Sequence, residues 1–223
     1  MLERWRFERG LRAAERSDEA VLRDYATADW VSLDTPVTEA DLLAVDFELD
    51  GLGRGAHLLQ AGWVPFTASA ISLGDAVVSD IRSTAELDRQ AVTIHGIGNT
   101  RAEAGESVRS VMTSLLRALS GRVLVAHGAA IETEAIAATC RKLFGIAPPI
   151  RAICTLVLER HLVSSLVGGE AYRLGPTRAR YGLPEYRAHD ALGDALAAAE
   201  LLLAQMTRLD PNIALKRIMK KAR

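Results

Sequence analysis

Apolar residues recur along the chain with two different periods, and these periods predict both strands and helices. Runs at 42–48, 58–67 and 69–78 are rich in the β-branched, aromatic and aliphatic residues that favour strands. Shorter apolar runs at 123–126 and 152–154 are typical of buried strands. Because only short segments separate the first three runs, we expect those strands to pair as an antiparallel meander.

Helical periodicity dominates the second half of the chain. Apolar residues at steps of three and four predict a helix from about residue 104 to 119 and another from about 130 to 144. A further helix follows the last short strand and reaches about residue 167, and the strongest runs from about 190 to 206. Three early strands followed by alternating helix and strand predict an α/β fold, with helices packed on a mixed five-stranded sheet.

The two ends differ in charge pattern from the middle of the chain. Residues 1–39 are charge-mixed and predict one or two short helices, in an extension that packs on the domain or serves for docking. Residues 40–207 form the expected main domain. Residues 208–223 hold six basic residues against one acid, which is typical either of a solvated end or of a tail that adds sequence-independent affinity for nucleic acid.

Composition narrows the functional classes. With 49% hydrophobic residues, 25% charged residues and a net charge of −1, the chain does not resemble a protein that coats nucleic acid by bulk charge. Its two cysteines, Cys140 and Cys154, favour a reduced intracellular protein. Since no secretory signal and no apolar run of roughly 18 residues is present, we expect a cytoplasmic protein without a membrane partner.

Two carboxylates stand two residues apart on the first predicted strand. Asp46 and Glu48 therefore leave the same face of the sheet, while the apolar residues between and before them occupy the other face. Neighbouring carboxylates repel unless a proton or a cation intervenes, and Mg²⁺ and Mn²⁺ prefer carboxylate oxygens. The pair precedes Gly51 at the carboxyl end of a strand, where α/β sheets place their ligand sites. A solvent-facing pair without a ligand is the structural alternative.

Two further segments offer reactive side chains. His189 stands just before the last helix and Asp194 about one turn into it, so both can project toward one side, and an imidazole can accept a proton from water. The alternative is a helix-end histidine with a surface aspartate. Glu132 lies near the start of the helix at 130–144, where an acid either complements the helix dipole or binds a metal.

Four short motifs lie in a fixed order along the chain: Asp46-Phe47-Glu48-Leu49-Asp50-Gly51-Leu52, Ile94-His95-Gly96-Ile97, Ala126-His127-Gly128-Ala129-Ala130-Ile131-Glu132, and His189 through Asp194. In order and spacing they resemble the motifs of the DEDDh (DnaQ-like) 3′→5′ exonucleases. That family includes the proofreading epsilon subunit of bacterial DNA polymerase III. The resemblance covers about residues 42–206.

The resemblance implies a ribonuclease-H-like fold, with a mixed five-stranded sheet and helices on both faces. It also implies that Asp46, Glu48, Glu132 and Asp194 hold two Mg²⁺ or Mn²⁺ ions, and that His189 is the general base. Two metals roughly 4 Å apart would stabilise the attacking and leaving oxygens of the phosphodiester and release nucleoside 5′-monophosphates.

The same resemblance implies which residues contact the substrate and which class of substrate they bind. Leu49 and His95 would lie against the terminal nucleotide of single-stranded DNA or RNA 3′ ends. DNA and RNA stay open as alternatives, as do a polymerase partner and the oligomeric state. The remaining histidines, His57, His127 and His161, have no comparable support for a role in the site, and we expect loop or core positions for them.

The motif at residues 126–132 departs from the family pattern. Glu132 replaces an aspartate and adds one methylene, Gly128 replaces an asparagine, and Ile131 replaces a phenylalanine. Leu49 and Asp50 replace two threonines of the opening motif. These changes leave one alternative function, a catalytically impaired nucleic-acid- or polymerase-binding module that keeps the exonuclease fold.

Overall fold

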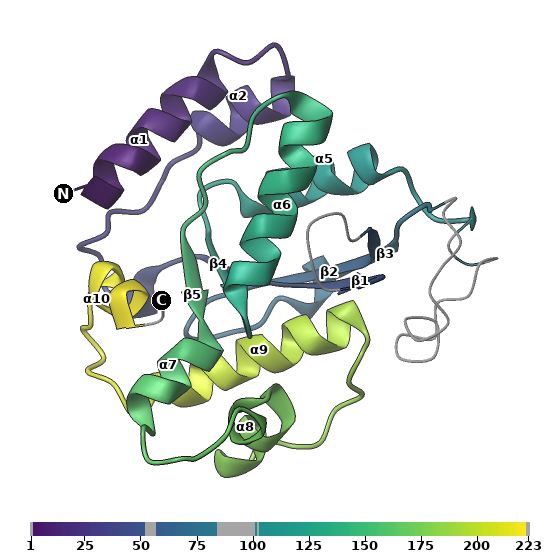
Figure 1. The fold of residues 1–223 in the computed structure, drawn as a ribbon. Helices are drawn as coiled ribbons and strands as arrows, with labels where there is room; N and C mark the ends of the chain where they lie inside the picture. Colours follow the sequence, from purple (N-terminus) through teal and green to yellow (C-terminus); the bar gives the residue numbers. More distant parts are fainter. Residues whose placement is uncertain (1, 52–56, 84–100, 102, 222–223) are drawn as a thin grey trace.

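A five-stranded mixed sheet forms the centre of the protein (Figure 1). The computed structural model describes residues 2–51, 57–83, 101 and 103–221. The strand order is β3-β2-β1-β4-β5, in which β2 is antiparallel to both β1 and β3, and β4 is parallel to both β1 and β5. The strands are β1 (Leu42–Leu49), β2 (Leu58–Phe66), β3 (Val77–Asp80), β4 (Val123–Ala126) and β5 (Ala152–Cys154). The predicted α/β fold with a mixed sheet is confirmed.

Helices cover both faces of this sheet (Figure 1). One face carries α1 (Leu2–Glu15), α2 (Ala20–Ala26), α5 (Val108–Leu119) and α6 (Ala129–Phe144). The other carries α7 (Thr155–Leu162), α9 (Ala191–Met206) and α10 (Leu215–Lys221), and α8 (Leu174–Arg180) packs against α9. Short 3₁₀ turns lie at Val37–Glu39, Leu73–Asp75 and Glu170–Tyr172. None of the helices in the described part of the chain has the length and apolar character that crossing a bilayer requires.

Alternation along β1 divides the core into two clusters. Leu43, Val45 and Phe47 pack toward α2, α5 and α6, whereas Leu42 and Ala44 pack toward α9. Because side chains alternate along a strand, Asp46 and Glu48 also face the α9 side. The sheet face that carries the two acids is therefore the face on which α9 lies.

The third strand is shorter than predicted and begins later. Residues 67–70 form a turn, in which the Thr67 amide donates to the Ala70 carbonyl at 2.9 Å, and Ile71 makes only an isolated antiparallel bridge with Phe66 before the 3₁₀ turn at Leu73–Asp75. Serine, glycine and aspartate in this segment favour turns over a ladder. The strand prediction for 69–78 is wrong except at its end, since β3 begins only at Val77.

Two helix ends also differ from prediction. α5 begins at Val108 instead of about residue 104, because the Ser107 hydroxyl caps it by accepting from the Ser110 amide at 3.1 Å. The Glu106 amide just before it donates to the Asp80 carbonyl at 2.8 Å, so this segment continues the sheet edge. α7 ends at Leu162 and does not reach residue 167.

Both chain ends pack on the domain. Leu22 and Tyr25 of α2 are fully buried against α5 and α6, and Leu215 and Ile218 of α10 are fully buried on the α9 side. The Lys216 amide donates to the Leu33 carbonyl at 2.9 Å. The alternative of a solvated C-terminal tail is therefore wrong for residues 213–219, where four apolar side chains are buried in the core, namely Ile213, Leu215, Ile218 and Met219.

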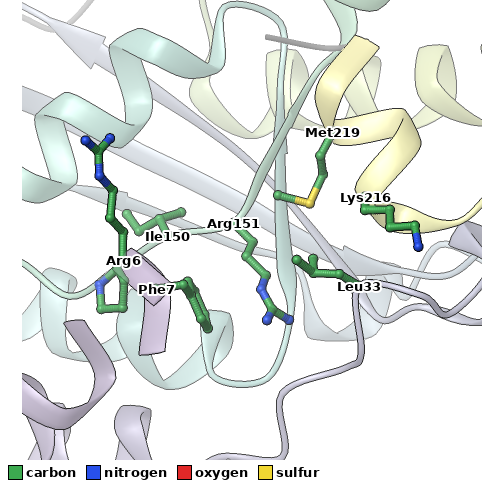
Figure 2. A pocket seen from close by; sticks show the side chains of 8 residues that line it. Arg6, Phe7, Leu33, Ile150, Arg151, Lys216 and Met219 are labelled. Carbon is green, nitrogen blue, oxygen red and sulfur yellow. The ribbon is translucent and has the colours of Figure 1, made fainter. Parts of the chain in front are cut away.

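The seam between the two chain ends encloses a small cavity of about 310 Å³ (Figure 2). Phe7 of α1 and Met219 of α10 contribute to its wall. The Arg151 guanidinium lies 4.1 Å from the centre of the Phe7 ring and donates to the Val31 carbonyl at 2.5 Å. Arg151 therefore ties the N-terminal helices to the start of β5.

The contact between α9 and β2 depends on one glycine. A Cβ atom at Gly62 would lie 2.3 Å from the Ala191 carbonyl carbon and 2.3 Å from the Leu192 nitrogen. Backbone therefore lies directly on backbone at this point, and no larger residue fits without moving the helix.

We expect Gly62→Ala to lower the free energy of unfolding by about 1–3 kcal/mol, because the added methyl group must push α9 away from the sheet. Urea unfolding of both proteins measures the change. Gly74→Ala is the matched control, since a Cβ at Gly74 meets nothing within 4 Å. Equal stability of the Gly62 and Gly74 variants would contradict this account of the contact.

Candidate active site

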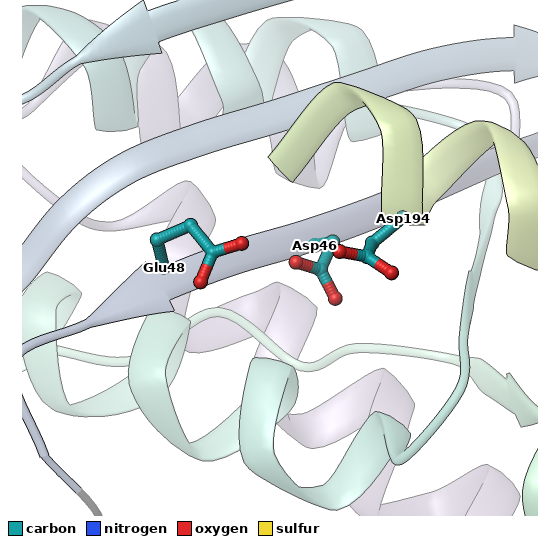
Figure 3. Close-up of side chains that lie close together, drawn as sticks. All are labelled: Asp46, Glu48 and Asp194. Atoms are coloured by element: carbon teal, nitrogen blue, oxygen red, sulfur yellow. The ribbon is translucent and has the colours of Figure 1, made fainter. Parts of the chain in front are cut away.

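Three carboxylates from two elements meet on the α9 side of the sheet. Asp46 and Glu48 come from β1 and Asp194 comes from the first turn of α9 (Figure 3). One oxygen from each residue lies within 4.8 Å of the others. The structure thus brings together three of the four carboxylates that the sequence predicted as metal ligands.

The approach of α9 to β2 produces this cluster. Asp46 pairs with Gly62 across the β1–β2 ladder, and Gly62 is the residue on which the helix backbone lies. The Ala191 amide donates to the Gln60 side-chain oxygen at 3.0 Å, and Gln60 is itself the ladder partner of Glu48. Neither Gly62 nor Gln60 was predicted as part of the site, although a glycine inside an apolar strand indicates a close backbone approach.

Glu132 lies beside this cluster on another element. It belongs to the first turn of α6, is 5% exposed, and its Oε2 atom is buried without a hydrogen-bond partner in the described structure. A buried carboxylate oxygen without a partner is costly unless a proton or a cation compensates it. Gly128 caps α6 with a φ of 121°, a backbone conformation that side-chain-bearing residues rarely adopt. This backbone conformation favours glycine at position 128, where the family pattern has an asparagine.

Burial and crowding of negative charge disfavour ionisation of the acids. Burial, followed by the charges of Glu132 and Asp194, raises the pKa of Asp46 well above its usual range. Burial raises the pKa of Glu132 to about 7, and burial together with the charge of Asp194 raises the pKa of Glu48 to about 7. Asp190, at the N-cap of α9, adds to the charge around both strand acids. A divalent cation would relieve this repulsion, and an all-carboxylate donor set suits Mg²⁺ or Mn²⁺.

His189 lies at the edge of the cluster in a backbone conformation unusual for a non-glycine residue. Its φ is 64°, and its amide donates to Asp194 Oδ2 at 2.8 Å, so Asp194 fixes the turn that presents the histidine. The exposed side chain lines a cleft of about 880 Å³ together with Asp194. The structure therefore places His189 and Asp194 at one opening, as their spacing predicted.

Tyr186 is a cleft residue that the sequence analysis missed. Burial, the charge of Asp194 and a hydrogen bond with that carboxylate raise the pKa of the Tyr186 hydroxyl. The guanidinium of buried Arg178 lies 5.0 Å from the Tyr186 ring centre and donates to the Pro184 and Ala197 carbonyls at 3.0 and 2.8 Å. Arg178 thus fastens the Tyr186 loop to α9. No motif in the chain points to either residue.

The remaining predicted residues lie outside the cluster. Leu49 ends β1 and packs against the core on the α5 and α6 side, so its predicted contact with substrate stays a prediction. His95 and its loop lie outside the described residues. His127 is partly buried between the Thr155 hydroxyl at 2.9 Å and the Tyr172 carbonyl at 2.8 Å, and desolvation lowers its pKa to about 4. His127 stands in the turn between β4 and α6 and lines the same cleft as His189 and Asp194.

Comparison with known proteins gives the family. The family model of the RNase_T exonucleases matches residues 43–202, which include both strand acids, Glu132, His189 and Asp194. The chain belongs to this exonuclease family. Its members generally use divalent metal ions, in agreement with the acidic cluster.

Two PolC-type DNA polymerase III proteins are similar in sequence. The protein from Thermotoga petrophila is 27% identical over 179 residues, and the one from Thermotoga maritima is 28% identical over 174 residues. Each match covers 78% of this chain but 12% of the polymerase. The chain thus corresponds to a small part of these relatives.

Solved structures of exonucleases share the fold. Exonuclease X in complex with 5′ overhanging duplex DNA gives a TM-score of 0.63 at 20% identity, covering 82% of this chain and 99% of that one. The nuclease domain of 3′hExo, a DEDDh family member bound to rAMP, gives 0.62 at 14% identity and covers 76% and 92%. Exonuclease I of E. coli with a dA16 oligonucleotide gives 0.67 at 15% identity and covers 82% and 42%. The predicted ribonuclease-H-like fold is confirmed.

The raised pKa values predict how the metal-free protein responds to pH. Between about pH 4.5 and 7 the folded state keeps protons on Glu48 and Glu132 that the unfolded state has lost, so the free energy of unfolding should fall as pH rises. Each unit of raised pKa corresponds to about 1.4 kcal/mol. Urea unfolding in a chelator at several pH values measures this slope.

Glu132→Gln is the matched control for this titration, because the amide is similar in size and does not ionise. The variant should show a flatter dependence of stability on pH than the wild type. Stability of the wild type that rises between pH 5 and 7 would contradict the assignment of protons to these acids.

Proposed function

We propose that the protein is a metal-dependent 3′→5′ exonuclease that removes nucleoside 5′-monophosphates from single-stranded ends. The observation that carries this proposal is the convergence of Asp46, Glu48 and Asp194 with oxygens within 4.8 Å, in a chain of exonuclease family. The unpartnered oxygen of Glu132 supports a fourth ligand beside them. An acidic cluster that only faced solvent would not need burial, yet Glu48 and Glu132 are 4% and 5% exposed.

Each residue has a distinct task in the proposed reaction. Asp46, Glu48, Asp194 and Glu132 would hold two divalent cations, Mg²⁺ or Mn²⁺. Bound there, the cations would neutralise charge on the scissile phosphate and make an attacking water more acidic. His189 would accept the proton of that water, since its side chain is exposed in the cleft beside Asp194. The hydrogen bond from its backbone amide to the Asp194 carboxylate would hold it beside the reacting centre.

The substrate and partner follow from the relatives and are part of the proposal. Solved exonucleases of this fold are complexes with duplex DNA carrying a 5′ overhang and with a dA16 oligonucleotide. We infer that the cleft takes a single-stranded 3′ end of DNA or RNA. Similarity to two PolC-type polymerases supports proofreading beside a polymerase as the setting for this activity.

The direct test is incubation of the purified protein with end-labelled single-stranded DNA and RNA of matched sequence. Mononucleotides should accumulate with Mg²⁺ or Mn²⁺ and should be absent in a chelator. Circular single-stranded DNA is the matched control, because it has no end. Cleavage of the circle, or equal degradation in the chelator, would contradict the proposal. No cleavage combined with binding of the same strands would favour the impaired binding module.

Replacement of His189 tests the general base. His189→Ala should lower kcat by roughly 10² to 10⁴, the usual contribution of a general base, and leave Mn²⁺ affinity nearly unchanged. His161→Ala is the matched control, because His161 is exposed near the end of α7 and does not line the cleft. Wild-type turnover in the His189 variant would reduce this histidine to a helix-end residue.

Replacement of Glu132 tests the fourth ligand. Glu132→Ala should abolish activity and remove one bound Mn²⁺, because the buried oxygen is then lost from the site. We expect Glu132→Asp to lose activity as well, since a carboxylate that is one methylene shorter would not reach the place that the buried Oε2 atom of Glu132 occupies. Exonuclease rates and Mn²⁺ titrations of both variants give the answer.

Glu134→Ala controls for the loss of a negative charge on the same helix. Glu134 is exposed and pairs with Arg141 at 2.9 Å, so its removal should leave the rate unchanged. If Glu132→Ala bound two ions and cleaved like the wild type, Glu132 would be only a helix-terminal acid.

A further inference from the structure

The first turn of α9 is hydrogen-bonded to a side chain outside the helix. The first backbone amides of a helix have no partner within it, and the N-cap residue Asp190 makes no side-chain hydrogen bond to them. The Ala191 amide donates instead to Gln60 Oε1 at 3.0 Å, across the interface with β2. Gln60 is 3% exposed, so water does not replace this bond easily.

The orientation of the Gln60 amide is fixed from its other end. Gln60 Nε2 donates to Asp80 Oδ1 at 2.8 Å, and a carboxylate can only accept. The amide oxygen must therefore point toward Ala191. Arg101 holds Asp80 in turn, with Nη2 donating to Oδ1 at 2.8 Å and Nε donating to Oδ2. A continuous chain of hydrogen bonds thus runs from Arg101 through Asp80 and Gln60 to the helix.

This chain ends at a candidate metal ligand. Asp194 lies one helical turn after Ala191, and its carboxylate meets Asp46. A shift of the first turn would carry Asp194 with it, and metal sites tolerate displacements of only about 0.5 Å. Gly62 permits the helix to approach the sheet, but a glycine holds nothing in place. The bond from Gln60 is the polar contact that sets where along β2 the helix begins.

We propose that Gln60 is a positioning residue of the metal site, oriented by the Asp80–Arg101 pair, which sets the place of Asp194 over Asp46. The inference rests on the proposed function, because it assigns Asp194 as a metal ligand. It deepens that function by assigning the geometry of the site to residues of β2 and β3 that are not themselves proposed as metal ligands.

The experiment uses an exchange of donor and acceptor. Gln60→Glu keeps an acceptor for the Ala191 amide but sets a carboxylate against that of Asp80. Gln60→Glu combined with Asp80→Asn restores a donor opposite the new carboxylate. Gln60→Leu removes both bonds. Leu73→Glu adds the same charge at an exposed turn, and Leu203→Ala loosens α9 away from the site, so these two are the controls for charge and for stability.

Two measurements are made on each full-length protein. Gln60→Glu and Gln60→Leu should lower Mn²⁺ affinity by roughly 10- to 100-fold, as loss of a supporting contact does at other metal sites. In the absence of metal, the Ala191 amide should exchange its hydrogen roughly fivefold faster or more. The double variant should recover both values to within about threefold, and the two controls should retain wild-type Mn²⁺ affinity.

The outcomes separate this inference from the proposed function. Wild-type protein that binds no Mn²⁺ would overturn the proposed function and, with it, the assignment of Asp194 as a ligand. If the wild type binds Mn²⁺ but Gln60→Leu keeps wild-type affinity and wild-type exchange at Ala191, the positioning role is overturned. A double variant no better than Gln60→Glu would overturn the role of Asp80 in orienting the amide.

Discussion

The candidate site depends on the direct contact between the backbone of α9 and strand β2. This contact requires a residue without a side chain at Gly62, opposite Asp46 in the ladder. It brings Asp194, from late in the chain, to two acids near the start of the domain. The alternation of β1 then sorts apolar residues to one face and acids to the other. Without this close approach, the carboxylates of β1 and α9 would not lie within 4.8 Å of one another.

This closeness makes it unfavourable for the buried carboxylates to be ionised unless a cation neutralises their charge. Burial raises the pKa values of Asp46, Glu48 and Glu132, and the charges of neighbouring acids raise those of Asp46 and Glu48 further, so the metal-free fold holds protons there at a cost in stability. A protein that retained the fold for binding alone would have no need to keep buried acids so close together. The same crowding gives a divalent cation a strong reason to bind. Family membership and local electrostatics therefore lead to the same proposal.

Much of this architecture could be predicted from sequence, and the failures have physical causes. The strands β1 and β2 were clear because both are nearly continuous apolar runs that bury on both faces, and α5 was clear because its apolar residues recur at helical steps along one buried face. The segment before β3 was mistaken for a strand because its apolar residues are separated by turn formers, whose hydrogen bonds are local. The C-terminal helix was read as a solvated tail because its charges outnumber the few apolar residues that bury.

At the site, motif spacing along the chain was sufficient to predict only the residues whose own side chains form the acidic cluster. Asp46, Glu48 and Asp194 were predicted and the structure brings them together. Gln60 and Tyr186 were missed, because their importance comes from partners that are distant in sequence and belong to no motif. A single sequence without a structure holds no signal for such pairings.

The central claim is that these acids form a two-cation site, and anomalous diffraction from a crystal soaked in Mn²⁺ tests it most directly. The account predicts two manganese peaks among the carboxylates of Asp46, Glu48 and Asp194, with Glu132 contacting one of them. The same soak of Asp194→Asn should lose at least one peak. A fully soaked wild-type crystal with no manganese at Asp46 would contradict the claim.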